Sequence, residues 1–234
     1  MENPERNLGL ERVQHQLRAD GVRDTPNPLR SGVHSRGYLP HVKREGASYF
    51  VTIRLADSLP QEVLLHFKQQ QAVQLRKLAE VDTEGREGAN RQLQRQIERY
   101  LDRGVGECHL RRVDIAAMVA EALRHFHGTE YLLDDWVIMP NHVHLVLWPM
   151  PNFTLSEIMQ SRKRHTARQA NLLLGRTGKT FWQPEPYDHW IRNDEEKGRI
   201  GRYIQNNPVK AKLCSRPEDW QWGSAWPGWM AQAD

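Results

Sequence analysis

The chain has 234 residues, with 33 Lys and Arg against 29 Asp and Glu, and only two cysteines. This length allows one or two domains with a substantial core, and two cysteines are too few for a disulfide framework. No apolar run approaches roughly 20 residues, the length of a membrane-spanning helix, and the start Met1–Arg6 is polar, so we expect a cytoplasmic protein without a secretory signal.

The N-terminal residues 1–37 are polar and are expected to form a tail outside the main fold. Leu10, Val13 and Leu17 can share one face of a helix, so this tail is predicted to contain at most one short helix.

Regular structure is predicted to begin near residue 47. Residues 49–55 alternate in the manner of a strand, and Pro60 opens a helical pattern that continues to about residue 81. The polar stretch 82–89 breaks this helix, and a second helix is predicted over about 90–102.

The middle of the chain predicts a helix followed by a hairpin. Residues 111–126 carry an apolar stripe at helical spacing. The two strands Tyr131–Met139 and His142–Trp148 follow, joined by the tight connection Pro140-Asn141.

The next helix is predicted from about Leu155 to Leu174, and a strand is expected within Phe181–Ile191. A final helix begins near Asn193, which can cap it, with Glu196 completing a capping box. Pro208 is expected to end this helix, because the residue before a proline is disfavoured in the α region.

The order of elements predicts the fold class. Without a helical insertion at about 60–109, the first six elements match the ferredoxin-like split βαβ pattern, an α/β (α+β) fold with an antiparallel sheet. The final helix, which begins near Asn193, is an addition to this six-element pattern. We expect three parts: a tail at 1–37, a main domain at 38–214 and a tryptophan-rich C-terminal tail at 215–234, which packs as a flap.

The sharpest local pattern is His142-Val143-His144 on a predicted strand. Residues two apart on a strand share a face, so the two imidazoles project together while Val143, Leu145 and Leu147 face a core on the other side. This arrangement suits two metal ligands, although two hydrogen-bonded strand histidines remain an equal alternative. The chain has too few strands for a cupin and the wrong order for a zinc hydrolase barrel.

A second pattern lies on the last helix. Tyr203 and Asn207 are four residues apart and share a face, while Ile200 and Ile204 supply the apolar stripe. The amide of Asn207 offers a third metal ligand, and a phenol becomes a useful nucleophile only against a metal-polarised phosphate. Packing of Tyr203 in the core is the ordinary alternative.

Charge is distributed unevenly along the chain. Residues 160–214 carry a net charge of +7, whereas the remainder sums to −3. A basic block of this kind suits a phosphate backbone, although a solvated surface without a partner is an even alternative. The candidate DNA-binding side chains are Arg54, Arg162, Lys163, Arg164, Arg202 and Lys210.

These motifs resemble those of a known family. Met139–Val146 is similar to the "PNHxH" block of single-tyrosine HUH transposases, and Tyr203–Ala211 resembles their catalytic-tyrosine helix. The resemblance covers about 37–225 and is greatest to the subgroup of REP-associated tyrosine transposases. Further matching stretches are Tyr49–Pro60, Phe181–Gln183, Tyr187–Arg192 and Glu218–Ala225.

The resemblance implies an enzyme that nicks single-stranded DNA and transfers strands at REP-like hairpins. In that family His142, His144 and a polar residue at Asn207 would hold a divalent ion, and Tyr203 would attack the scissile phosphate. The products are a 5′-phosphotyrosine link and a free 3′-OH. Two departures stand out: Asn207 replaces a glutamine of many relatives, and Gln183–Pro186 lacks a basic residue common in the subgroup.

Mg²⁺ or Mn²⁺ is the expected cofactor, because an open site of two imidazoles and one amide is weak for zinc. We expect a monomer in the bacterial cytoplasm at the nucleoid, with a dimer that exchanges tyrosine helices as the alternative. Two other functions stay open: a hairpin-binding protein without turnover, and a metal-dependent nuclease that uses water.

Overall fold

The structure is a computed structural model that describes residues 32–35, 40–43, 46–60 and 94–232, together with five helical positions between 62 and 73. The short helix predicted around Leu10–Leu17 and the break at 82–89 lie outside the described residues. The predicted helices at 60–81 and 90–102 are confirmed where they are described, at those five positions and at 94–101.

A small two-stranded sheet was not predicted. β1 (Gly32–Ser35) pairs antiparallel with β2 (Pro40–Lys43). β1 lies within the expected polar tail 1–37, so that expectation was wrong at this point. Each strand contains a single valine, which is why neither shows the apolar alternation that predicts a strand.

The main sheet confirms the ferredoxin-like prediction. Its four strands lie in the order β4-β5-β3-β6, and every pair is antiparallel. The elements in chain order are β3 (Tyr49–Arg54), α4 (Val113–Arg124), β4 (Tyr131–Ile138), β5 (His142–Pro149), α5 (Leu155–Leu173), β6 (Tyr187–Trp190) and α6 (Asp194–Lys210).

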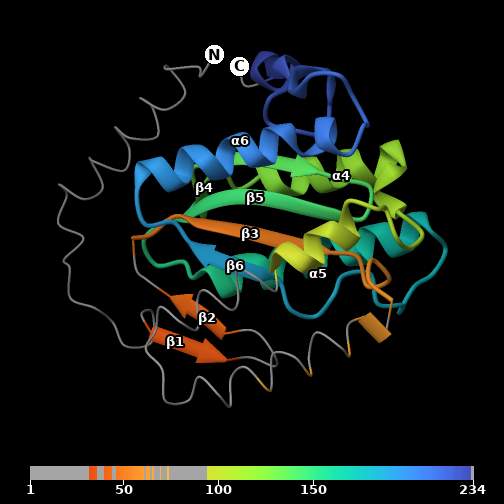
Figure 1. The fold of residues 1–234 in the computed structure, drawn as a ribbon, viewed down its shortest axis with the longest axis horizontal. Coiled ribbons are helices and arrows are strands. Elements are labelled where there is room, and N and C mark those ends of the chain that lie inside the picture. The colour runs from red at the N-terminus through yellow and green to blue at the C-terminus, as the bar shows by residue number, and fades with distance from the viewer. Residues whose placement is uncertain are drawn as a thin grey trace.

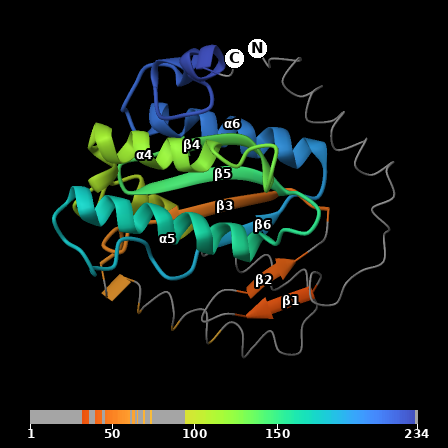
Figure 2. The same ribbon diagram turned by 180° about the vertical axis from the view of Figure 1, so that it is seen from behind.

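Helices cover both faces of this sheet. α4 and α5 lie on one face, and α6 lies on the other, as the two opposite views show (Figures 1 and 2). The helical residues 94–101, yellow in Figure 1, are on the side of α6, where Ile97 and Leu101 share a buried cluster with Ile204. The sheet therefore separates two different interiors.

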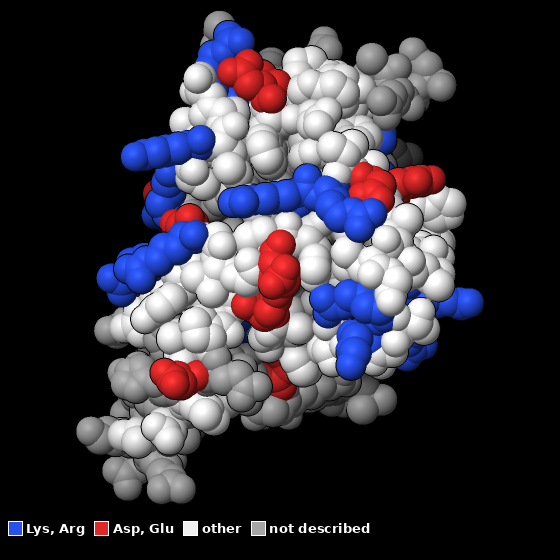
Figure 3. Space-filling view, turned by 90° about the vertical axis from the view of Figure 1, so that its right-hand side faces the viewer, with Lys and Arg blue, Asp and Glu red and all other residues white. Residues whose placement is uncertain are grey.

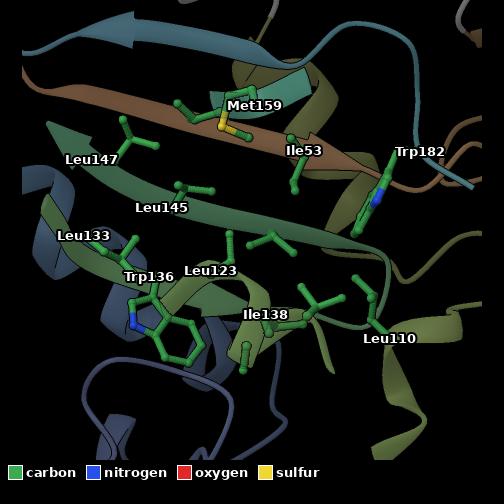
Figure 4. Packing of buried hydrophobic residues seen from close by; sticks show 14 of the residues in the cluster. Ile53, Leu110, Leu123, Leu133, Trp136, Ile138, Leu145, Leu147, Met159 and Trp182 are labelled. Atoms are coloured by element: carbon green, nitrogen blue, oxygen red, sulfur yellow. The ribbon is translucent and has the colours of Figure 1, made fainter. Parts of the chain in front are cut away.

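The face toward α4 and α5 contains the larger apolar core. Leu145 and Leu147 of β5 project into it and meet Leu123 of α4 and Met159 of α5 (Figure 4). Trp136 of β4 lies at its edge. Because alternate residues of each strand contribute to this layer, the opposite face is left for other side chains.

The bounds of α5 agree with those predicted from the sequence, whereas the predicted cap and end of α6 differ in part from the structure. Thr154 and Glu157 form a capping box at α5. At α6, Asn193 accepts a hydrogen bond from the Glu196 N–H, as predicted. The Glu196 carboxylate, however, accepts from the N–H of Arg192 at 2.9 Å and not from the Asn193 N–H, so the predicted second half of the capping box was wrong.

Pro208 does not end α6, which continues to Lys210. A proline removes only its own N–H, and the last turn is closed by the N–H groups of Ala211 and Leu213, which donate to Asn207 and Pro208 at 3.0 and 2.9 Å. Asn207 therefore lies inside the helix and is buried, not at a frayed end.

The C-terminal tail pairs with the edge strand β4. The N–H of Ile138 donates to Trp222 at 2.7 Å, and the N–H of Ser224 donates to Trp136 at 2.8 Å. Two short 3-10 turns, Pro217–Asp219 and Pro227–Gln232, shape this segment. Of the helices that the structure describes, none has the length and apolar character needed to cross a membrane.

Candidate active site

The two histidines of the His-x-His pattern lie side by side on β5 and face α6. His142 is 1% exposed and His144 is 0% exposed, and their ring centroids are 4.6 Å apart. Val143 between them joins the core on the opposite face, as alternation along a strand requires. The prediction that both imidazoles project together from an apolar layer is confirmed.

Asn141 fixes the protonation pattern of His142. Its amide nitrogen donates to the carbonyls of Leu101 and Val105 at 3.3 and 3.0 Å, so its oxygen must be the atom that lies 2.8 Å from His142 Nδ1. An amide oxygen only accepts, and His142 Nδ1 therefore carries the proton. The lone pair of His142 is left on Nε2, which is the arrangement of a metal-binding imidazole.

His144 is held between β3 and the tyrosine helix. Thr52 Oγ1 of β3 lies 2.8 Å from His144 Nδ1, and the Phe50 ring stacks on the imidazole at 5.4 Å. Burial, followed by the charge of Lys210, lowers the pKa of His144 to about 3. Burial and the neighbouring His144 lower the pKa of His142 well below its usual value. Both rings are neutral at pH 7, the form that binds metals.

α6 brings Tyr203 over this histidine pair. The Tyr203 hydroxyl lies 3.3 Å from His144 Nε2, and its ring meets the edge of Phe50 at 6.1 Å. Ile204, the next residue, is fully buried in the apolar cluster under α6. The helix therefore has the two neighbouring faces that the sequence predicts, one apolar and one directed at the histidines.

The side chains fit a metal ion. His142 Nε2 and both polar atoms of the Asn207 amide are buried and make no well-formed hydrogen bond within the described residues. Buried polar groups are normally satisfied, so these three atoms are candidates for binding a ligand, and the Asn207 amide lies beside Tyr203. The part of the chain that is described has no group of three His, Cys, Asp or Glu spaced for a metal, so an ion here would take two imidazoles and one amide.

The phenol of Tyr203 needs help to become a nucleophile. Burial, followed by the nearby carboxylate of Glu98, raises the pKa of Tyr203 above its ordinary value. The hydroxyl therefore keeps its proton at neutral pH until another group removes it.

Comparison with known proteins finds similar sequences. Residues 112–207 match the model of a family described as Transposase IS200 like. The REP-associated tyrosine transposase of Escherichia coli (strain K12) is 29% identical over 115 residues, which span 47% of this chain and 67% of that protein. The chain is therefore similar to the REP-associated tyrosine transposases.

Two solved structures are also similar. One is described as the REP-associated tyrosine transposase bound to a REP hairpin, with 18% identity, a TM-score of 0.45 and coverage of 85% of each chain. The other is a putative transposase from Deinococcus radiodurans R1, with 16% identity, a TM-score of 0.32 and coverage of 74% of this chain and 96% of that one.

The matched region, which we call the transposase domain (residues 112–207), contains both histidines, Tyr203 and Asn207. The resemblance inferred from the sequence motifs is confirmed. The helical residues 94–101 and the C-terminal tail lie outside the transposase domain, although both contact it.

A bulge in β4 anchors the tyrosine helix of the transposase domain. The strand register shifts between Leu133 and Trp136, and Asp134 and Asp135 fall in this irregular segment. Asp134 forms an ion pair with Lys197 at 2.9 Å, and Asp135 accepts a hydrogen bond from Gln205 at 2.8 Å. Bulges often redirect side chains near active sites, and here two carboxylates hold α6 from both sides of Tyr203.

The helix approaches β4 closely because of one glycine. A Cβ atom at Gly201 would overlap the Asp135 carboxylate. That carboxylate cannot easily move away, because Ser224 Oγ donates to it at 3.2 Å and Gln205 Nε2 donates to it as well. Gly201 thus sets the distance between α6 and the sheet, and so the height of Tyr203 above His144.

Two of the six candidate DNA contacts, Arg54 and Lys210, lie near the histidines, and Lys163 lies near Arg54. Arg54 is 1% exposed and is paired with His142 in the register of β3 and β5. Lys210 forms an ion pair with Asp102 at 2.6 Å. Lys163 donates to the carbonyls of Gln183 and Pro184, both at 2.6 Å, and burial with the nearby Arg54 lowers its pKa to about 8.

The other three candidates are placed differently. The Arg162 guanidinium is buried over the Phe126 ring at 3.8 Å, on the side of α5. Arg164 and Arg202 are exposed. On the face seen in Figure 3, basic side chains form several groups interleaved with acidic ones instead of one continuous patch. The structure therefore does not gather all six side chains on one surface.

Several residues of the site carried no usable signal in the sequence. Thr52 lies within the matching stretch Tyr49–Pro60, but nothing in that stretch marks it as a partner of a histidine, and Glu98 lies on a helix outside every recognisable motif. Asp135 and Gly201 were detectable only as exceptions, an acidic residue within a strand pattern and a glycine within a helix pattern. Such exceptions indicate close approach but do not say to what.

Proposed function

We propose that this chain is a metal-dependent enzyme that cleaves single-stranded DNA at REP-like hairpins and rejoins strands through a 5′-phosphotyrosine at Tyr203. One observation carries the proposal: the Tyr203 hydroxyl lies 3.3 Å from His144 Nε2, beside a second neutral imidazole and a buried amide without well-formed hydrogen bonds. The relation to the REP-associated tyrosine transposase of Escherichia coli supports the choice of substrate.

In the proposed reaction the Tyr203 oxygen bonds to the scissile phosphorus, and the bond from phosphorus to the 3′ oxygen breaks. The 3′ oxygen takes a proton and leaves as a 3′-OH, while the 5′ phosphate stays on the tyrosine. Attack of a 3′-OH on this link reverses the step and joins two strands. The link conserves the energy of the phosphodiester, so the reaction needs no ATP.

His142, His144 and Asn207 would hold the ion. Mg²⁺ or Mn²⁺, when bound, would polarise the scissile phosphate and stabilise its developing charge. These two metals are chosen because phosphoryl chemistry favours them and because two imidazoles and one amide make a weak zinc site. The protein itself orients the rings through Thr52 and Asn141.

The proposed phosphate contacts divide by position. Arg54, buried opposite His142 in the strand register, is suited to the scissile phosphate itself. Lys163 lies near Arg54, Lys210 lies near His142, and Arg202 is exposed one residue before Tyr203. Arg162 and Arg164 on α5 would contact DNA farther from the cut. Such contacts supply affinity, whereas base contacts supply specificity.

We further propose that the chain acts as a monomer at the bacterial nucleoid, with 38–214 as its catalytic domain and 60–109 as an insertion. α6 packs on the sheet of its own chain through Lys197, Gln205 and Ile204, so Tyr203 already faces the histidines of the same molecule. A dimer that exchanges tyrosine helices would have to break these contacts. Light scattering after size exclusion distinguishes the two states.

The proposal is tested with a labelled single-stranded hairpin oligonucleotide and Mg²⁺ or Mn²⁺, followed by denaturation. We expect a gel-stable adduct at the new 5′ end that the cut produces, and none with a double-stranded oligonucleotide, because the tyrosine needs an unpaired strand for in-line attack. Cleavage without an adduct would indicate a nuclease that uses water. Tight binding without cleavage under any metal would indicate a binding protein.

A further inference from the structure

The helix at residues 94–101 forms a wall of the active site although it lies outside the transposase domain. Ile97 and Leu101 are buried in the cluster that also contains Ile204 of α6, and Tyr203 packs against that cluster. Leu101 also accepts the hydrogen bond that orients Asn141. These contacts fix the helix against both the histidine strand and the tyrosine helix.

Glu98 is the residue of this helix that contacts the nucleophile. Its carboxylate lies beside the Tyr203 side chain, with which it lines one pocket and interacts electrostatically, and Gln94 Nε2 donates to its Oε1 at 3.2 Å. The neighbouring acidic residue, Asp102, is instead paired with Lys210 at 2.6 Å. Glu98 is thus a positioned acceptor for the Tyr203 hydroxyl.

A pocket opens on this contact. It has a volume of about 580 Å³ and is lined by Arg95, Gln96, Glu98, Arg99, Tyr203 and Lys210. Three of these six side chains are cationic, so the pocket attracts a phosphate backbone toward Tyr203. The carboxylate and the phenol lie together on its wall, where an incoming strand reaches both.

We propose that Glu98 is a catalytic residue: it takes the proton of the Tyr203 hydroxyl as the phenol oxygen bonds to the scissile phosphorus. This role rests on the proposed function and goes beyond it. The O–H bond of Tyr203 breaks and an O–H bond forms on Glu98, while the departing 3′ oxygen takes its proton from water. In strand transfer the steps reverse, and the protonated Glu98 returns the proton to the leaving tyrosine oxygen.

His144 is the rival acceptor, since its Nε2 lies 3.3 Å from the same hydroxyl. An imidazole lone pair directed at a metal ion is not available for a proton. With His144 assigned to the ion, Glu98 remains as the acceptor in contact with Tyr203. Burial raises the pKa of Glu98, which suits a carboxyl group that must both accept and return a proton.

The test compares Glu98→Gln and Glu98→Asp with the wild type in single-turnover adduct formation from pH 5.5 to 9. Glutamine keeps the shape and the contact with Gln94 but accepts no proton, so we expect adduct formation to slow by about 10²-fold or more near neutral pH. Glu98→Asp keeps a carboxylate and should retain part of the rate. Thermal unfolding and hairpin affinity should stay close to the wild type in both variants.

The pH profile separates a base from a structural role. Wild-type and Glu98→Asp rates should rise with pH and then level off when the carboxyl is ionised, whereas the Glu98→Gln rate should keep rising because hydroxide must replace the base. Lys210 and Tyr203 on α6, and Asp102 directly after the helix of Glu98, also face Glu98. Asp102→Asn therefore serves as the charge control, and it should keep the wild-type shape of the profile.

Two failures are distinguishable. A Glu98→Gln variant that forms the adduct at the wild-type rate with the wild-type profile overturns the role of Glu98 and leaves the proposed function standing. A wild-type chain that forms no adduct under any metal overturns the proposed function and the base together.

Discussion

The two faces of β5 differ in almost every respect. Toward α4 and α5, Val143, Leu145 and Leu147 join a continuous apolar core. Toward α6, the same strand presents His142 and His144, both buried and both held by polar neighbours. One strand therefore serves stability on one side and chemistry on the other, separated only by the alternation of its side chains.

The difference has an energetic consequence. Burying a polar group costs free energy unless its hydrogen bonds are restored, and the α6 face buries several such groups. They include Thr52, Arg54, His142, His144 and Asn207. The apolar face offsets this cost, so the fold tolerates an interior arranged for a ligand and not for packing.

The largest effect is expected when a histidine on the polar face of β5 is substituted. His142→Ala and His144→Ala should each abolish adduct formation, a loss on the order of 10³-fold or more, because each removes a proposed metal ligand worth several kcal/mol to the transition state. Hairpin affinity should stay within a few-fold, since phosphate contacts supply it. Denaturing gels measure adduct formation, and filter binding measures hairpin affinity. Equal losses of binding and cleavage would contradict the metal role, and His165→Ala, an exposed position on α5, is the control.

A substitution on the apolar face of β5 should instead lower stability and leave the chemistry intact. Leu145 is 0% exposed, and Leu145→Ala should lower the free energy of unfolding by about 2–5 kcal/mol through lost burial and a cavity. Adduct formation per folded molecule, measured at low temperature, should remain close to the wild type. Denaturant titration gives the first quantity. A variant of normal stability that loses cleavage would show that the two faces are not separate in this way.

The spacing between α6 and the sheet sharpens the comparison. In Gly201→Ala the new Cβ overlaps the Asp135 carboxylate and should displace Tyr203, so we expect adduct formation to slow by about 10²-fold, the effect of a misplacement near 1 Å. Gly198→Ala is the matched control, because its Cβ meets only the mobile end of Arg202 at 3.4 Å. Similar rates for the two variants would refute the role of the close approach.

A milder change is expected at Asn207, the third proposed ligand. Asn207→Ala removes one amide while both imidazoles remain, so adduct formation should slow about tenfold to a hundredfold in Mg²⁺. Because Mn²⁺ binds nitrogen ligands more readily than Mg²⁺, raising the Mn²⁺ concentration should restore part of the rate. A loss that Mn²⁺ does not change would remove Asn207 from the ligand set.

The sequence predicted those parts of the site that follow from local geometry. A period of two places His142 and His144 on one face, and a spacing of four places Tyr203 and Asn207 together. The ferredoxin-like strand order followed from the sequence of elements. In contrast, the prediction that Pro208 ends the last helix was wrong. A proline near a helix end removes only one hydrogen bond, and hydrogen bonds of the next turn close the helix instead.

Other features depend on contacts between distant segments. Glu98 meets Tyr203 across 105 positions of the chain, and nothing on its own helix distinguishes it from a solvated glutamate. Asp135 and Gly201 likewise have meaning only as a pair brought together by β4 and α6. Tertiary packing, which no local pattern encodes, decides these contacts.

The most direct test of the account is Tyr203→Phe with the labelled single-stranded hairpin. Phenylalanine removes one oxygen and little volume, so packing against Phe50 and hairpin affinity should persist. We expect both the covalent adduct and all cleavage to disappear, and peptide mass mapping of the wild-type adduct to place the 5′ phosphate on Tyr203. Cleavage by Tyr203→Phe at a rate near the wild type would show that water is the nucleophile and would contradict the central claim.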